Sequence, residues 1–149
     1  MGATAKAHHP TPPSQPRDPA RPCSCVSATL RLKVMLEKAE ESGVDNLQVL
    51  SLSFDPKHDS PGILKDYAHA YQLDETRFRL GTGPIPLMED IRRQIGIATR
   101  KDPKLVIDHT FRIAVIDEHR RVIAEILGPN WSVETTLARI RTLVQEEEK

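Results

Sequence analysis

Two β-rich segments near the C-terminus constrain the fold more than any other feature of the chain. They are TFRIAVI at 110–116 and RVIAEIL at 121–127, and the four residues DEHR connect them. Two such runs joined by so short a connection predict an antiparallel hairpin. Gly128-Pro129 then ends the second strand, because proline lacks the backbone N–H that a ladder needs. Ser132 follows as the predicted N-cap of a final helix, whose inner face consists of Val133, Leu137, Ile140 and Val144.

The rest of the chain alternates between helical and extended patterns. We predict a helix where apolar residues recur every three or four positions, and a strand where short apolar runs are bounded by turn residues. In chain order the patterns predict a helix over 28–39, a strand over 47–54, a helix that begins after Asp59 or Ser60, a short strand at 77–80 and a helix that Gly96 closes. This order indicates an α/β fold in which helices cover a small sheet.

The first 22 residues have a different composition from the rest. They contain six prolines and no Val, Ile, Leu or Phe. Such a segment has little apolar surface to offset the entropy of ordering, so we predict a disordered arm over 1–22 and a domain over 23–149. The arm also lacks the apolar core of a secretory signal. His8 and His9 could bind a metal, or they could be solvated residues of the arm.

Composition excludes several classes of function. The 149 residues suit one domain, and 21 Lys and Arg balance 21 Asp and Glu. Balanced charge and few aromatic residues argue against a nucleic-acid binder. The longest apolar runs have four or five residues, too few for a membrane-spanning helix. Two cysteines are also too few to build a disulfide scaffold, so they indicate a site or nothing.

The two cysteines, Cys23 and Cys25, stand at the predicted start of the first helix with one residue between them. They could be a metal site, a redox pair or vestiges on a loose segment. The positive end of a helix dipole favours the thiolate form, which binds metal and exchanges disulfides. In an extended backbone both thiols would share one side, with Cα atoms about 6.5 Å apart. That separation is near the upper limit for a relaxed disulfide, so an extended pair suits a metal better.

An ordered set of motifs resembles the SCO/SenC family, thioredoxin-like copper proteins that serve assembly of cytochrome c oxidase. The set begins with a strand that leads into the pattern Asp-Pro-x-x-Asp-x-Pro, formed by residues 55–61, and continues with the helix around LKDYA. RFRLGTG at 77–83 looks like the loop before the family's third helix. Asp108-His109 then stands just before the hairpin. Together these motifs cover about residues 44 to 147.

The resemblance implies a thioredoxin-like sheet with flanking helices and a copper site, with Cu(I) or Cu(II) as the cofactor. Family members bind copper through C-x-x-x-C at the start of the first helix and a histidine before the hairpin. The corresponding ligands here are Cys23, Cys25 and His109, although the spacing is C-x-C. Asp55 and Asp108 would lie beside the metal and orient its ligands. The implied partner is the copper-bearing subunit of cytochrome c oxidase or another copper or thiol protein, in the periplasm or at the inner-membrane surface.

The chain departs from the family at its start. The family's first strand lies in the middle of the sheet, and here the Pro-rich arm occupies that position in the sequence. We therefore predict a sheet that lacks its usual first strand. The implied function is binding and transfer of copper rather than enzymatic turnover. The alternatives are a thioredoxin-type thiol–disulfide oxidoreductase, which the absence of C-x-x-C disfavours, and a degenerate remnant without a metal site.

The individual polar residues also have ordinary interpretations. His109 could be a strand-end histidine whose hydrogen bonds go to the backbone. Asp55 could form an Asx turn ahead of Pro56, and Asp108 could be a solvated loop acid. We expect the three remaining histidines to lie on the surface, and they are His58, His69 and His119.

Overall fold

The structure is a computed structural model that describes residues 3–8, 24–53, 55–96, 99–101, 107–109, 112–128 and 130–147. In chain order its elements are β1 (Ala3–His8), α1 (Ser24–Ala39), β2 (Gln48–Ser53), α2 (Pro61–Ala70), β3 (Phe78–Gly81), α3 (Ile85–Gln94), β4 (Thr99–Lys101), β5 (Ile107–His109), β6 (Arg112–Ile116), β7 (Val122–Leu127) and α4 (Val133–Glu147). The alternation of helix and strand confirms the predicted α/β class.

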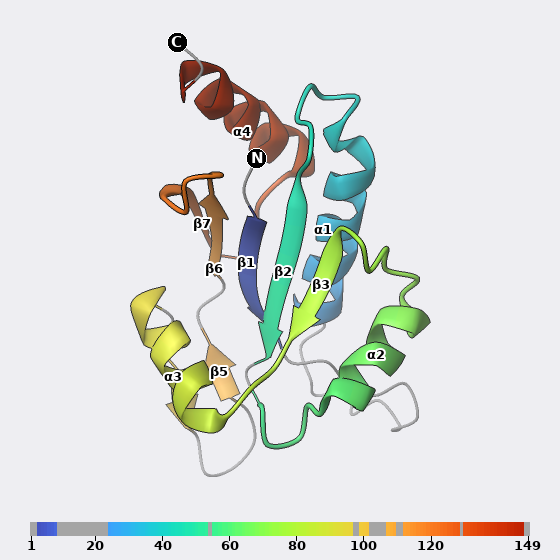
Figure 1. The fold of residues 1–149 in the computed structure, drawn as a ribbon, viewed down its shortest axis with the longest axis vertical. Coiled ribbons are helices and arrows are strands. Elements are labelled where there is room, and N and C mark those ends of the chain that lie inside the picture. Colours follow the sequence, from blue (N-terminus) through green and yellow to red (C-terminus); the bar gives the residue numbers. More distant parts are fainter. Residues whose placement is uncertain are drawn as a thin grey trace.

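Five strands form the main sheet in the order β3-β2-β1-β6-β7 (Figure 1). β1 pairs with β2 and β2 with β3 in parallel, whereas β6 is antiparallel to both β1 and β7. The predicted hairpin is therefore confirmed as β6 and β7. A second sheet consists of β4 and β5 alone, and the sequence patterns did not predict it.

The prediction that the sheet lacks its first strand is wrong. β1 lies in the centre of the sheet, with Ala5 opposite Leu50 of β2 and opposite Ala114 of β6. Its residues carry no proline, since the first proline of the chain is Pro10. Every residue of β1 can therefore donate a backbone hydrogen bond, which a central strand requires. The prediction of a disordered arm is therefore wrong for residues 3–8. Residues 9–22 lie outside the described residues, and the domain boundary at residue 22 stays a prediction.

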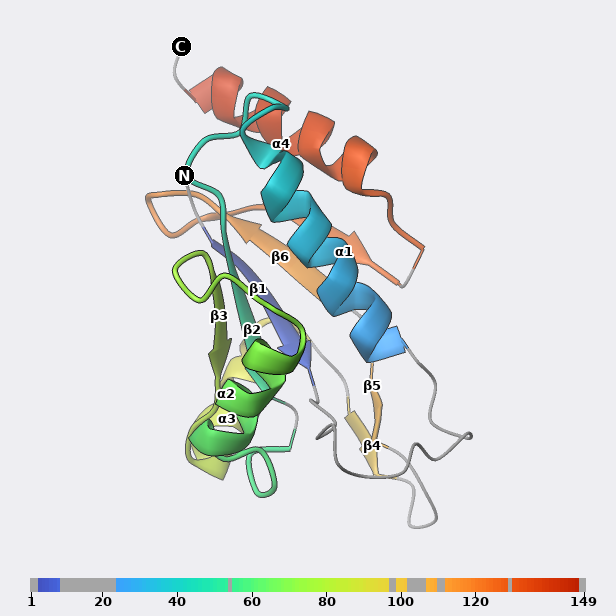
Figure 2. The same ribbon diagram turned by 90° about the vertical axis from the view of Figure 1, so that its right-hand side faces the viewer.

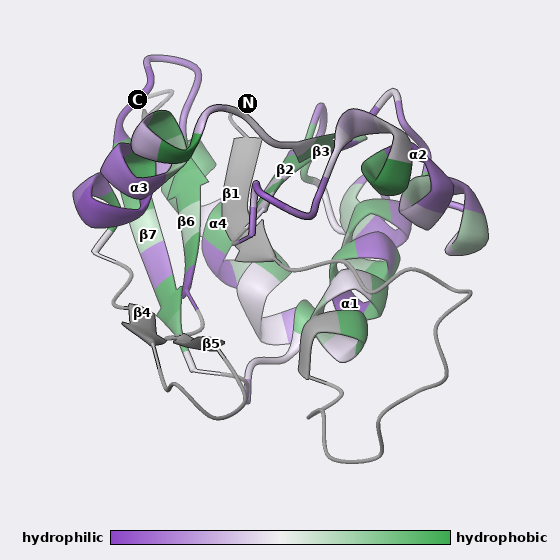
Figure 3. Cartoon of the chain, turned by 90° about the horizontal axis from the view of Figure 1, so that it is seen from below, coloured by the Kyte–Doolittle hydropathy of each residue, from purple (hydrophilic) through white to green (hydrophobic). Residues whose placement is uncertain are grey.

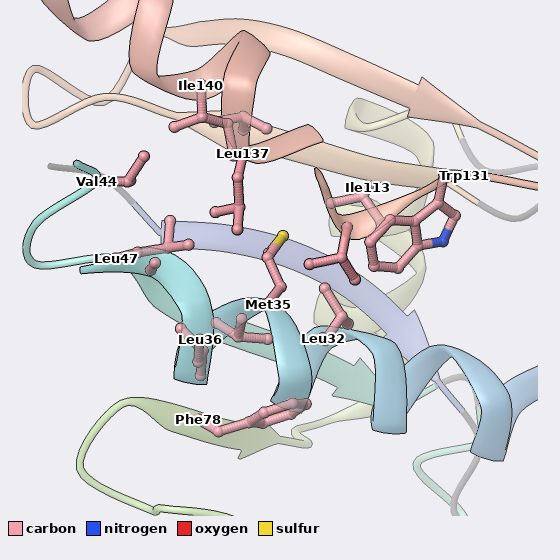
Figure 4. Close-up of a cluster of buried hydrophobic side chains, with 14 of the residues drawn as sticks. Leu32, Met35, Leu36, Val44, Leu47, Phe78, Ile113, Trp131, Leu137 and Ile140 are labelled. Carbon is pink, nitrogen blue, oxygen red and sulfur yellow. The ribbon is translucent and has the colours of Figure 1, made fainter. Parts of the chain in front are cut away.

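Helices α1 and α4 contact one another and lie together on one face of the sheet (Figures 1 and 2). Their apolar stripes face the strands because residues three and four apart share one side of a helix. Figure 4 shows the resulting core, to which α1, β3, β6 and α4 all contribute. Its largest fully buried side chains are Leu32, Met35, Val44, Leu47, Val49, Tyr67, Phe78, Ile113, Val115, Leu137 and Ile140.

The ends of the elements follow the turn chemistry of the sequence. Ser60 is the N-cap of α2, where its Oγ accepts a hydrogen bond from Ile63 N at 3.3 Å. Ser132 caps α4 in the same way, through a 3.1 Å bond from Thr135 N. Gly96 ends α3 with φ of +68°, the left-handed conformation that favours glycine. Both predicted helix starts and the predicted end of α3 are confirmed.

The parallel strands β1, β2 and β3 all finish at one end of the sheet, which Figure 3 shows along the strands. The start of α1 and the small β4–β5 sheet lie at this same end (Figures 1 and 2). Ligand sites in open α/β sheets form beyond the carboxyl ends of the strands. Among the described helices, none combines the length and the apolar character that crossing a bilayer requires.

Candidate metal centre

The predicted thiol ligands stand at the start of α1. Cys25 is the second residue of that helix, while Cys23 lies outside the described residues. Because α1 begins at Ser24, the backbone there is helical. The extended backbone that would bring both thiols to one side is therefore not present at residues 24–25.

His109 is the last residue of β5, and its backbone pairs with Thr99 of β4. Asp108 pairs with Arg100 in the same ladder. β6 then begins at Arg112, so the histidine lies just before the hairpin, as expected. The small antiparallel ladder fixes the backbone of both residues at the end of the sheet where α1 begins. Their roles at a metal stay predictions.

The loop after β2 folds tightly around Asp55. Its carbonyl accepts hydrogen bonds from the backbone N–H groups of His58 and Asp59, at 3.0 and 2.9 Å. Its carboxylate lies 2.7 Å from Nδ1 of His58. The Asp55 side chain is thus directed to His58, although the His58 ring stays 68% exposed. The surface position of His58 is confirmed, but its pairing with Asp55 was not predicted.

A buried carboxylate lies beneath this loop. Asp59 is only 1% exposed and accepts a 2.5 Å hydrogen bond from Ser53 Oγ. Ser53 Oγ also accepts from the backbone N–H of Asp55 at 3.0 Å. One hydroxyl at the end of β2 therefore holds both ends of the loop. The sequence suggested Asp59 as a possible N-cap, and the buried Ser53 at the carboxyl end of the strand was the signal that could have indicated this network.

The other histidines behave as surface residues. His69 lies on the exposed side of α2 and His119 lies in the hairpin turn, so the prediction for both is confirmed. Within the part of the chain whose side chains are described, no three His, Cys, Asp or Glu residues gather as a metal site.

Comparison with solved structures places this fold among Sco proteins. The copper-bound ScoI of Arabidopsis thaliana superposes with a TM-score of 0.78 at 16% identity, covering 97% of this chain and 83% of that one. The copper-bound yeast Sco1 gives 0.74 at 18% identity, with 96% and 75% covered. A SCO1/SenC family lipoprotein of Bacillus anthracis gives 0.74 at 21% identity, with 95% and 80% covered.

Sequence comparison assigns the family. No curated protein matches the chain significantly. The sequence model of the SCO1/SenC family, however, matches residues 22–145, which is most of the chain. The matched region runs from α1 into α4 and includes every residue of the predicted copper site. This protein belongs to the SCO1/SenC family.

Proposed function

We propose that the protein binds copper as cargo and transfers it to another copper protein. The proposed ligands are Cys23, Cys25 and His109. The observation that carries the proposal is the position of two segments far apart in sequence. The start of α1 and the end of β5 lie at the same end of the sheet, beyond β1 and β2 (Figures 1 and 2). Two related folds, from Arabidopsis thaliana and yeast, were solved with copper bound.

The chemistry of the donor set fits copper in its reduced state. Cu(I) prefers soft ligands, so two thiolates and one imidazole nitrogen make a suitable set. The start of α1 supports the thiolate form, because its backbone N–H groups and dipole favour negative charge there. A low coordination number also suits transfer, since an acceptor can replace three ligands one at a time.

We expect capture by both thiols to change the start of α1 locally. A helix rotates by about 100° per residue, so residues two apart face nearly opposite sides. An extended Ser24 would bring both sulfurs to one side, so we propose that Ser24 leaves the helical conformation when the ion binds. The cost is small, because the first N–H groups of a helix have no intrahelical partner to lose. We therefore expect copper binding to open the first turn of α1.

Two carboxylates are proposed to support the ligands. Asp108 adjoins His109 in β5, and Asp55 lies in the loop after β2 at the same end of the sheet. Partners of this kind typically fix the orientation of ligand side chains. The Ser53–Asp59 network holds the Asp55 loop in one conformation, which would keep such a partner in place.

The acceptor we propose is the copper-bearing subunit of cytochrome c oxidase. This assignment rests on the family resemblance. Copper held by two thiolates and an imidazole can pass to an acceptor of similar donors without net change in oxidation state.

Titration of the reduced protein with Cu(I), in competition with a chromogenic chelator, tests the proposal. We expect one tightly bound ion, and His109→Ala should weaken the affinity at least tenfold, or about 1.4 kcal/mol. Cys23→Ser and Cys25→Ser should each weaken the affinity by more than His109→Ala does. His69→Ala is the matched control, since it removes an exposed imidazole from α2, and it should leave the affinity unchanged.

A dithiol reductase assay beside the titration separates the alternatives. Dithiol reductase activity without tight copper binding would favour a thiol–disulfide oxidoreductase. Absence of both activities would indicate a remnant. A titration in which His109→Ala and His69→Ala behave alike would contradict the ligand role of His109.

A further inference from the structure

Arg112, at the start of β6, connects three elements near the proposed copper site. Its guanidinium donates a 2.6 Å hydrogen bond from Nη1 to the carbonyl of Ile95, at the end of α3. The same nitrogen lies 3.5 Å from Glu125 of β7. The Arg112 side chain is 21% exposed and that of Glu125 is 44% exposed, so the arginine is the more buried partner of this pair.

The contact with α3 has a clear electrostatic basis. The last carbonyls of a helix have no intrahelical donor and carry the negative end of the helix dipole. Ile95 is the C-cap of α3, and Arg112 supplies a cation and a donor to it. Gly96 follows, and because glycine has no Cβ it leaves room for the guanidinium. A Cβ added to Gly96 would lie only 2.3 Å from Nη1 of Arg112.

The position of this contact relates directly to His109. In the small sheet Thr99 is opposite His109, Arg100 is opposite Asp108, and the chain between them forms β4 and β5. Gly96 lies three residues before Thr99, and Arg112 lies three residues after His109. The Arg112–Ile95 hydrogen bond therefore joins the two segments that flank β4 and β5. It closes the open end of the β4–β5 hairpin, next to the Thr99–His109 pair.

Stability alone does not account well for this arrangement. Nε of Arg112 is buried, and among the described groups none accepts its hydrogen bond. A buried donor that finds no acceptor costs free energy, which argues against a purely stabilising role for this side chain. The 17-residue separation of the bonded pair also means that the contact removes much of the freedom of the intervening chain.

We propose that Arg112 is a positioning residue for His109. Its guanidinium, held on the carbonyl of Ile95, fixes the backbone of the β4–β5 hairpin and so the place of His109 relative to the start of α1. The inference rests on the proposed function, because it gives His109 its role at copper. Arg112 itself is not a ligand in this account. It acts through the hairpin that it closes.

Two substitutions disturb the contact from opposite sides. Arg112→Met removes the guanidinium and keeps much of its apolar stem, while Gly96→Ala drives a methyl group into the guanidinium. Gly128→Ala is the matched control for the second, because Gly128 has φ of +78° and no neighbour within 4 Å of an added Cβ. It imposes similar backbone strain without touching Arg112.

Hydrogen exchange of the copper-free full-length protein measures how stably the β4–β5 ladder is closed. We expect Arg112→Met and Gly96→Ala to speed exchange at least fivefold in residues 99–101 and 107–109, with β2 and α4 unchanged. Gly128→Ala should leave exchange in the hairpin as it is. Unchanged exchange in both test variants would overturn the proposal.

Cu(I) affinity measures the link to His109. Arg112→Met should weaken the affinity about tenfold when His109 is present and add no further loss in the His109→Ala background. Equal losses in both backgrounds would overturn the positioning role, because they would indicate a general structural effect. Failure of the unmodified protein to bind Cu(I) would instead refute the proposed function, and the two failures are therefore distinguishable.

Discussion

Replacement of Ala5 by proline tests the central strand of the sheet. Ala5 stands opposite Leu50 on one side and Ala114 on the other, so its backbone lies inside two ladders. Proline removes the N–H, and a buried carbonyl left without its donor costs about 1–3 kcal/mol. The ring also pushes the strand from its neighbours, so we expect a total loss of about 3 kcal/mol or more. A domain of this size loses about 2–4 °C per kcal/mol, which gives a fall in Tm of roughly 6–12 °C.

Thermal unfolding followed by circular dichroism measures this loss. Ala5→Ser is the matched control, since serine keeps the backbone N–H at the same position and should cost less than about 1 kcal/mol. Both variants should fold at low temperature with the same helix content. Equal melting temperatures for the proline and serine variants would refute the reasoning, because residues 3–8 would then make no ladder on which the sheet depends.

Two further predictions concern the stability of the fold. Leu137 of α4 is 1% exposed, so Leu137→Ala should lower the free energy of unfolding in urea by about 2–5 kcal/mol. Leu127 is 61% exposed, so Leu127→Ala should change that free energy by less than about 1 kcal/mol. In the hairpin turn, burial raises the pKa of Asp117, but hydrogen bonds from Arg121 at 2.7 and 2.6 Å and its charge outweigh burial, so the pKa is lowered overall. The ionised carboxylate therefore stabilises the fold above its unfolded pKa, and this contribution is lost as pH falls through the lowered folded-state pKa. Urea titrations between about pH 5 and pH 2 should show a smaller fall in the free energy of unfolding for Asp117→Asn than for the unmodified protein.

The helices could be predicted from the sequence because each has a continuous apolar stripe. Leu32, Met35 and Ala39 recur at helical spacing, and all three are buried in α1. The hairpin was equally clear, since two β-rich runs stand on either side of a short turn. Both signals are local, and tertiary packing agrees with them.

β1 could not be predicted because its stability comes from its position. Ala, Thr, Lys and His give the segment ATAKAH no strong strand preference, and the prolines from Pro10 onward dominated the composition of the first 22 residues. Ladders on both sides hold the strand, and such long-range pairing is not written in the segment itself. β4 and β5 were missed because three residues each are too few to show a strand period.

The candidate site was only partly predictable. The position of His109 before the hairpin followed from its motif, and the structure adds the β4–β5 ladder that holds its backbone. The burial of Asp59 and its bond from Ser53 were not foreseen, because either Asp59 or Ser60 could have capped α2. The contact of Arg112 with Ile95 joins residues that no local pattern relates.

X-ray absorption at the copper edge of the reduced, Cu(I)-loaded protein tests the central claim most directly. The account predicts a shell of two sulfur atoms, from Cys23 and Cys25, and one nitrogen scatterer, from His109. His109→Ala should lose the nitrogen and keep both sulfurs. A spectrum without sulfur ligands, or one that His109→Ala leaves unchanged, would contradict the proposed copper centre.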